Sequence, residues 1–167
     1  QISNNDLDKI SHIGFIGAGQ MGSGITQVCA QSGFPVTLVD VSDEILDKAI
    51  DGIRKRLQRL VDRDRITAKA LENAISYIRP STDYTQFGNC DLVLEAATEN
   101  EDIKKAIFGK LLPHLNSHAV LATNTSSISI TRLAASTDRP NKFIGLHFMN
   151  PVPVMKLVEL IRGIATD

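Results

Sequence analysis

Residues 14–22 read Gly-Phe-Ile-Gly-Ala-Gly-Gln-Met-Gly, and this stretch decides the fold. It places glycines between an apolar run typical of a buried strand and an amphipathic segment typical of a helix. Gly17 allows a tight turn, Gly19 leaves the backbone open to a bound group, and Gly22 lets the helix pack closely on the sheet. The first amides of that helix favour a negatively charged ligand, because they point at it from the positive end of the helix dipole.

A carboxylate follows the next predicted strand at the distance that a dinucleotide site requires. Asp40 ends that strand 18 residues after Gly22, where its oxygens can accept hydrogen bonds from both hydroxyls of an adenosine ribose. The same charge repels a 2′-phosphate, and Val41 and Ser42 bring no arginine to hold one, so the sequence favours NAD over NADP. Two other interpretations stay open: a purely structural glycine turn, and Asp40 as the cap of the following helix.

Short β-branched segments alternate with longer amphipathic ones along the chain. This alternation predicts an α/β fold of the Rossmann type, a doubly wound and mostly parallel sheet with helices on both faces. A long helical insertion follows the second strand, where a simple crossover would need only one helix of ordinary length. We expect strands over residues 12–16, 36–40, 76–79, 92–95, 120–123, 143–147 and 155–160. We expect helices over residues 20–32, 44–63, 68–75, 101–112 and 128–135, with Gly33 ending the first, Asp43 capping the second and Thr67 preceding the third.

The bulk composition limits the classes of function. The chain has 167 residues, of which 43% are hydrophobic, and this suits one domain that folds without metal ions or disulfides. A formal net charge of -1 gives no field for gathering nucleic acid or an anionic membrane, and no side-chain cluster has the spacing of metal ligands. Only two cysteines, a polar start and no apolar run of about 18 residues predict a cytoplasmic protein, with the mitochondrial matrix as the open alternative. The start at Gln1 and the stop at Asp167 suggest a piece of a longer protein.

Polar and small residues follow the later strands, at the edge where parallel sheets bind ligands. After the fourth strand, the small residues Ala96 and Ala97 would let a cofactor lie close to the backbone, whereas Thr98 or Asn100 has the equal alternative of capping the next helix. After the fifth strand come four consecutive polar residues, at positions 124–127. We expect one of the two serines there to cap a helix and at least one of the other three residues to bind a ligand.

The last loop carries a candidate catalytic pair. His147 ends a predicted strand, and the chain turns back through Pro151 and Pro153 into a strand that contains Glu159. A hairpin centred on Pro153 puts His147 and Glu159 opposite each other, six residues away on either side. A carboxylate on one imidazole nitrogen leaves the other free to take a proton from an alcohol, as carbonyl–alcohol redox chemistry with NAD requires. The open alternative is a core histidine and a solvent-facing glutamate.

With these motifs, residues 13–162 resemble the N-terminal NAD-binding domain of the L-3-hydroxyacyl-CoA dehydrogenases, including the 3-hydroxybutyryl-CoA enzymes. The most specific matching stretches are residues 17–24, 95–96, 124–127 and 145–159. The resemblance implies hydride transfer between NAD and the C3 position of an L-3-hydroxyacyl-CoA or 3-ketoacyl-CoA, in fatty-acid or butyrate metabolism. It also implies a helical domain, absent from this sequence, that closes over the acyl chain and forms a homodimer. We therefore expect poor turnover by this chain alone.

The resemblance also implies roles for individual residues. It makes His147 the general base and Glu159 its partner, and it places Ser126 against the substrate oxygen and Asn150 beside nicotinamide and substrate. It puts Glu99 and Lys104 near the NAD. Together with the motifs above, the expected cofactor-binding residues are Gly17, Gly19, Gln20, Met21, Gly22, Asp40, Ala96, Glu99, Lys104 and Asn124. The candidates for the CoA phosphates, against the alternative of a solvated helix face, are Arg56 and Arg63.

Two other classes of function stay open. Another Rossmann oxidoreductase, such as a β-hydroxyacid dehydrogenase, would share the glycine turn but lack the His-Phe-Met-Asn-Pro segment that leads to Glu159. A non-catalytic nucleotide-binding or structural module, as in eye-lens proteins built on this family's scaffold, would keep the fold. The intact His147 and Glu159 argue against a loss of catalytic function.

Overall fold

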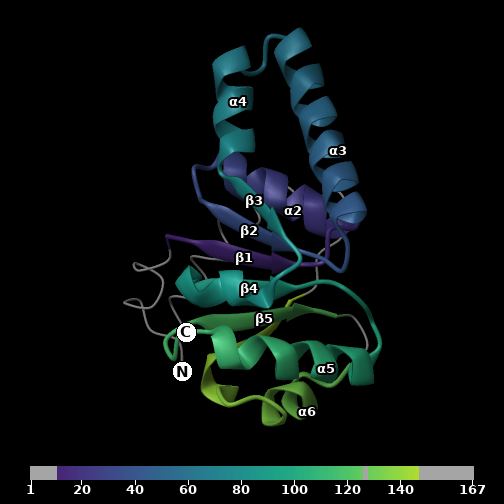
Figure 1. The fold of residues 1–167 in the computed structure, drawn as a ribbon, viewed down its shortest axis with the longest axis vertical. Helices are drawn as coiled ribbons and strands as arrows, with labels where there is room; N and C mark the ends of the chain where they lie inside the picture. The colour runs from purple at the N-terminus through teal and green to yellow at the C-terminus, as the bar shows by residue number, and fades with distance from the viewer. Residues whose placement is uncertain (1–10, 126–127, 147–167) are drawn as a thin grey trace.

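The computed structural model describes residues 11–125 and 128–146. Over these ranges it shows a six-stranded parallel sheet in the order β3-β2-β1-β4-β5-β6 (Figure 1). The strands are β1 (Ile13–Ile16), β2 (Val36–Val39), β3 (Ile78–Ser81), β4 (Leu92–Glu95), β5 (Val120–Asn124) and β6 (Phe143–Leu146). The strand order reverses between β1 and β4, and the predicted doubly wound Rossmann sheet is therefore confirmed. The expected strand over residues 155–160 lies outside the described residues.

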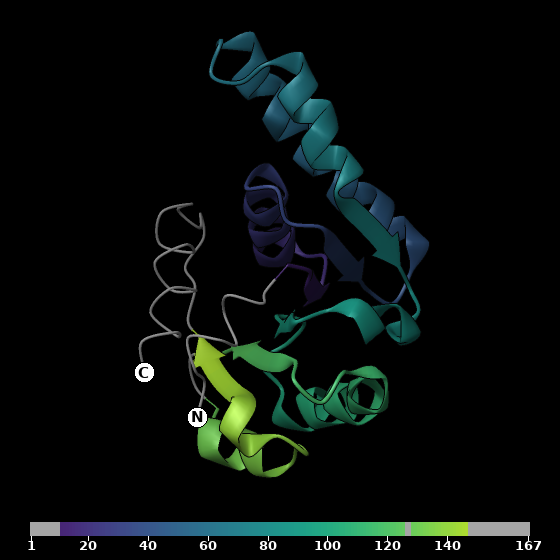
Figure 2. The ribbon, with the colours of Figure 1, turned by 90° about the vertical axis from the view of Figure 1, so that its left-hand side faces the viewer.

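Helices cover both faces of this sheet (Figures 1 and 2). One face carries α2, α3 and α4, and the other carries α5 and α6. The bounds of the helices are α2 (Gln20–Gln31), α3 (Asp43–Asp62), α4 (Ala68–Ser76), α5 (Glu101–Leu111) and α6 (Ile130–Ala135). Short 3-10 helices add η1 (Tyr84–Asn89), η2 (Leu112–His114) and η3 (Pro140–Lys142). None of the helices in the described part of the chain is both long and apolar enough to cross a membrane.

Alternate residues of the strands divide between two hydrophobic cores. Phe15 and Leu38 pack on the side of α2 and α3, whereas Val39, Val93 and Leu121 pack on the side of α5 and α6. Since both faces of the sheet are covered, strands β1, β2 and β4 are buried at every position. This is the physical reason for continuous apolar runs in the sequence in place of a strict alternation.

The predicted helical insertion between β2 and β3 is confirmed as α3 and α4. Leu46, Ala49, Ile53 and Leu57 recur at helical spacing on α3 and are buried, so that one face of α3 packs against α2 and α4. The joined ends of α3 and α4 extend beyond the sheet in both views (Figures 1 and 2). The insertion is thus a helical hairpin anchored to the domain at one end.

Several predicted helix boundaries are correct and others are wrong. Gly33 follows α2 with a φ of +90°, which confirms it as the stop of that helix, and Thr67 caps α4. Ser42 rather than Asp43 caps α3, because its hydroxyl accepts a hydrogen bond from the Ile45 amide. α6 begins later than predicted, at Ile130, with Ser129 as its cap in place of either expected serine. β3 also begins later, at Ile78, because α4 continues through Ser76.

Both cysteines lie in the cores, and burial raises the pKa of the Cys29 and Cys90 thiols to about 12. The thiolate is the reactive form, and it is nearly absent from the folded protein at mildly alkaline pH. We therefore expect iodoacetamide to leave both thiols unmodified in the native protein and to modify both in concentrated urea, as measured by intact mass. Glutathione in the same reaction controls for the reagent. Rapid native labelling of either cysteine would contradict this placement.

Candidate functional site

The glycine turn joins β1 to α2 at the carboxyl edge of the sheet. Gly17 has a φ of +110°, which L side chains rarely adopt, and a Cβ there would lie 3.0 Å from the backbone of Ala96. A Cβ on Gly22 would lie only 1.8 Å from the carbonyl oxygen of Gly17. Gly19 is different, because an added Cβ would meet nothing within 4 Å among the described residues. The turn is therefore closed on its inner side by Gly17 and Gly22 and open on its outer side at Gly19.

This geometry makes Gly22 and Gly19 respond differently to the same substitution. We expect Gly22→Ala to lower the free energy of unfolding by about 3 kcal/mol or more, because the clashing atom is backbone and cannot rotate away. Gly19→Ala is the matched control, since Gly19 caps α2 with a φ of -70° that alanine adopts readily. We expect it to change the free energy of unfolding by less than about 0.5 kcal/mol. Urea denaturation measures both, and equal losses would contradict a steric origin.

The carboxylate of Asp40 lies beside the glycine turn. One of its oxygens accepts a hydrogen bond from the Ala18 amide at 2.7 Å, and the other accepts one from the Val41 amide at 2.6 Å. The alternative of Asp40 as a helix cap is wrong, because Ser42 caps α3. The half-buried carboxylate therefore connects the end of β2 to the turn that follows β1.

A cavity of about 740 Å³ opens beside Asp40. Its walls come from the segments after β2, β3 and β4 and from α5, and they include Val41, Tyr84, Ala97 and Ile103. Val41 and Ile103 are 84% and 50% exposed, and both line this one cavity. Burial and the nearby Asp40 carboxylate raise the pKa of Tyr84, so its phenol stays neutral. Apolar walls next to one carboxylate suit a flat apolar ring that is attached to a sugar.

The sequence analysis missed these cavity residues. Tyr84 lies in η1, a short 3-10 helix that no hydrophobic periodicity in the sequence predicts. Ile103 was expected to lie in a helix, but no binding role was predicted for it. The one available signal was Val41, an apolar residue directly after the carboxylate, at a position where turns are usually polar.

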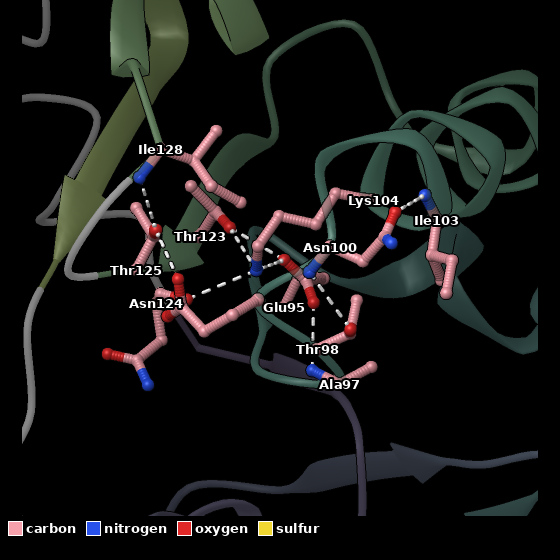
Figure 3. Close-up of polar contacts among 11 residues, drawn as sticks. Glu95, Ala97, Thr98, Asn100, Ile103, Lys104, Thr123, Asn124, Thr125 and Ile128 are labelled. Carbon is pink, nitrogen blue, oxygen red and sulfur yellow. Dashed lines mark hydrogen bonds and ion pairs between the residues drawn. The ribbon is translucent and has the colours of Figure 1, made fainter.

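The ends of β4 and β5 share a buried polar network (Figure 3). Lys104 on α5 and Glu95 at the end of β4 form an ion pair of 2.5 Å, and both side chains are 0% exposed. The Lys104 ammonium also donates hydrogen bonds to the Thr123 hydroxyl and the Asn124 carbonyl, each at 3.1 Å. The Thr123 hydroxyl in turn donates to Glu95 at 2.6 Å, and the other oxygen of Glu95 accepts from the Ala97 amide at 2.8 Å.

A second connection joins the same two loops. The hydroxyl of Thr125 donates a hydrogen bond to the Glu99 carboxylate at 2.9 Å and accepts one from the Ile128 amide at 3.2 Å. Asn100 caps α5 through the Ile103 amide, so the capping alternative for this loop is correct. The loops after β4 and β5 are therefore held together by side-chain contacts rather than by the sheet alone.

Only some of the other predicted site residues lie at the carboxyl edge of the sheet. Ala96, Glu99 and Asn124 lie at the carboxyl edge, and Met21 packs against the core under α2.

Arg56 and Arg63, the candidates for the CoA phosphates, are not brought together. Arg56 reaches back from α3 to donate hydrogen bonds to Gln27 at 2.7 Å and Ser23 at 3.4 Å, whereas Arg63 is exposed at the end of α3. The side chain of Gln20 and the predicted catalytic residues lie outside the described residues, the latter being Ser126, His147, Asn150 and Glu159.

Comparison with known proteins identifies this arrangement. The family "3-hydroxyacyl-CoA dehydrogenase, NAD binding domain" matches residues 12–167. The chain belongs to this family. Its sequence is 52% identical over 158 residues to 3-hydroxybutyryl-CoA dehydrogenase of Bradyrhizobium diazoefficiens, an alignment that covers 95% of this chain and 54% of that protein. The predicted family and its cofactor, NAD, are both confirmed.

Other relatives agree with this assignment. The probable 3-hydroxybutyryl-CoA dehydrogenase of Deinococcus radiodurans is 50% identical, over 92% of this chain and 55% of that protein. The crystal structure of (S)-3-hydroxybutyryl-CoA dehydrogenase from Ralstonia eutropha superposes with a TM-score of 0.86 at 37% identity, covering 94% of this chain and 62% of that one. The chain spans about half the length of the curated relatives it matches.

The described residues of the 3-hydroxyacyl-CoA dehydrogenase domain fit NAD. The outer side of the turn at Gly19 is free for a pyrophosphate, next to the first amides of α2. The Asp40 carboxylate stands at the rim of the apolar cavity, as a ribose between pyrophosphate and adenine requires. A dinucleotide can therefore lie across the carboxyl edge at the point where the strand order reverses.

Proposed function

We propose that this chain binds NAD across the carboxyl edge of its sheet and contributes to hydride transfer between NAD and C3 of an L-3-hydroxyacyl-CoA or 3-ketoacyl-CoA. The observation that carries the proposal is the Asp40 carboxylate, held against the glycine turn at the mouth of an apolar cavity. The names of the relatives, which are 3-hydroxybutyryl-CoA dehydrogenases, support the substrate class.

In this proposal the adenosine half of NAD lies over β1 and β2. Each Asp40 oxygen accepts one amide hydrogen bond and keeps a lone pair for a ribose hydroxyl. Val41 and Ile103 cover the faces of the adenine and lose their exposure to water. The Asp40 carboxylate would repel a 2′-phosphate at this place, and for that reason we propose a preference for NAD over NADP.

The nicotinamide half then extends over β4 and β5. In a doubly wound sheet the two halves of a dinucleotide lie on opposite sides of the reversal point, which here lies between β1 and β4. The loops that contain Ala96, Glu99 and Asn124 follow those strands. Gln20 and Met21 start the helix beneath the pyrophosphate. These residues are our proposed contacts for this half of the cofactor.

The reaction needs a proton acceptor beside the hydride acceptor. When bound, NAD accepts the hydride from C3 of the alcohol or returns it to the ketone from its reduced form. We propose that His147 takes the hydroxyl proton in the first direction and gives it back in the second, with its imidazolium oriented by Glu159. Ser126 and Asn150 would hold the oxygen and the acyl group in place. The support for these four roles is the family membership and the sequence motif.

The proposal also includes a site for the CoA part of the substrate. Arg63 is the better placed of the two candidates for a CoA phosphate, because it is exposed whereas Arg56 is engaged with α2. Since the chain spans about half of its relatives, we propose that closure over the acyl chain and dimerisation depend on a helical domain, and that this chain turns over slowly by itself.

The glycine turn offers a direct test of NAD binding. We expect Gly19→Ala to weaken NAD binding about tenfold or more, because the added Cβ occupies the space next to the backbone that a pyrophosphate needs. Calorimetric titration with NAD measures the affinity. Gly109→Ala on α5 is the control, since its Cβ also meets nothing within 4 Å in the described part of the chain but lies in a helix away from the turn. Unchanged affinity in the Gly19 variant would contradict the proposed path of the cofactor.

The chemistry is tested with acetoacetyl-CoA and NADH at high enzyme concentration. We expect His147→Gln to slow hydride transfer by about a hundredfold or more while NAD affinity stays unchanged, because only the group that gives its proton to the substrate oxygen in this direction is lost. The loss of NADH absorbance in single turnover gives the rate. His118→Gln is the control, since that exposed histidine lies beside Asp91, before β5. Equal rates in the His147 variant would mean that another group is the base.

A further inference from the structure

Glu99 brings a second carboxylate to the carboxyl edge of the sheet. It is exposed, and it lies in the loop between β4 and α5, directly before the Asn100 cap. Asp40 follows β2, on the other side of the point where the strand order reverses. A dinucleotide has two riboses, each with neighbouring hydroxyls that can donate hydrogen bonds to a carboxylate. The two carboxylates therefore lie on the two sides of the edge where those riboses are expected.

The Glu99 carboxylate needs a partner to keep its position. Its side chain is longer than that of Asp40, and an exposed glutamate samples several rotamers unless a neighbour fixes it. The Thr125 hydroxyl is such a neighbour, because it donates a hydrogen bond to one Glu99 oxygen at 2.9 Å. This contact joins residues 26 apart in the sequence, in the loops after β4 and β5.

The hydroxyl of Thr125 does more than stabilise its own loop. Its oxygen accepts a hydrogen bond from the Ile128 amide at 3.2 Å (Figure 3). That local contact needs only an acceptor, as at Thr67, whose hydroxyl accepts from the Ala70 amide at 3.0 Å. The donation to Glu99 is therefore an additional contact. Since Thr125 is only 8% exposed, it offers a ligand little surface of its own.

We propose that Thr125 is a positioning residue that holds the Glu99 carboxylate for the nicotinamide ribose of the cofactor. Thr125 gives its hydroxyl hydrogen to one carboxylate oxygen and so restricts the rotamer of Glu99. One accepted hydrogen bond does not exhaust a carboxylate, which has several lone pairs for the ribose hydroxyls. Thr125 thus acts on NAD through Glu99. This inference rests on the proposed function, in which Glu99 contacts the nicotinamide half of the cofactor.

The first test is Thr125→Val, which removes the hydroxyl and keeps the side-chain volume. We expect it to weaken the binding of NAD and of ADP-ribose about fivefold, because both ligands contain the second ribose. Affinity for ADP, which ends at the pyrophosphate, should change less than about twofold. Calorimetric titration measures the three affinities. A parallel loss for ADP would show a general disturbance of the edge, and unchanged NAD affinity would show an idle hydroxyl. Either result would overturn the inference.

Two further variants control for the hydroxyl and for stability. Thr125→Ser keeps the donor, and we expect its NAD affinity to stay within about twofold of that of the unsubstituted chain. A loss as large as in Thr125→Val would contradict the role of the hydroxyl. Thr67→Val removes a capping hydroxyl from α4, away from the edge. It should lower the free energy of unfolding in urea and leave NAD affinity unchanged.

A double-mutant cycle separates action through Glu99 from action through the loop. We expect Glu99→Ala to weaken NAD and ADP-ribose binding and to spare ADP, because it removes the ribose acceptor. In that background Thr125→Val should change NAD affinity by less than about twofold, since the group that it positions is already absent. If Thr125→Val weakens NAD binding equally with and without Glu99, the hydroxyl acts through the Ile128 amide, and the inference is overturned.

The same cycle distinguishes this inference from the proposed function. Full NAD affinity in Glu99→Ala would overturn the proposed contact between Glu99 and the cofactor. A loss in Glu99→Ala together with full affinity in Thr125→Val would overturn only the positioning role of Thr125.

Discussion

The close contact between Gly22 and the carbonyl of Gly17 is the constraint on which the binding edge depends. With no Cβ between them, the start of α2 sits directly on the turn that leaves β1. This position aims the first amides of α2 outward at Gly19 and brings the Ala18 amide to the Asp40 carboxylate. A larger residue at position 22 would push the helix away from the sheet and open the turn. The first amides of α2 and the Asp40 carboxylate, which are the proposed contacts of the pyrophosphate and the ribose, would then separate.

The two halves of the carboxyl edge are built on different physical principles. On the side of β2 the edge is open and apolar, with Val41 and Ile103 left in water beside a cavity. On the side of β5 the edge is closed and polar, because the buried ion pair of Lys104 and Glu95 connects the loops that follow β4 and β5. The first half suits a base that contributes affinity by burial. In the proposed function the second half holds the nicotinamide ring, whose position must be restricted because hydride transfer depends steeply on geometry.

Much of the fold could be predicted because its signals are periodic and local. The buried strands, the apolar face of α3 and the helix stop at Gly33 each follow from neighbouring residues. Helix caps were harder, because Ser42 and Asp43 are both good caps and only the local geometry chooses between them. The cavity could not be predicted, since Tyr84 and Val41 come from segments far apart in sequence that the sheet order brings to one edge.

The sequence by itself determined the glycine turn, the carboxylate after β2 and the family of this domain, because each depends on backbone sterics or on a contiguous motif. Only the tertiary structure decided where the Lys104 ammonium lies and which groups it contacts. From its spacing alone it is an anomalous charge on an apolar helix face, and from the family resemblance it is a neighbour of NAD. Parallel pairing of β4 with β5 brings Thr123 and Asn124 to Glu95, and the ammonium on α5 is buried where they meet. The low local dielectric makes that pairing obligatory, because a buried charge must find its partner.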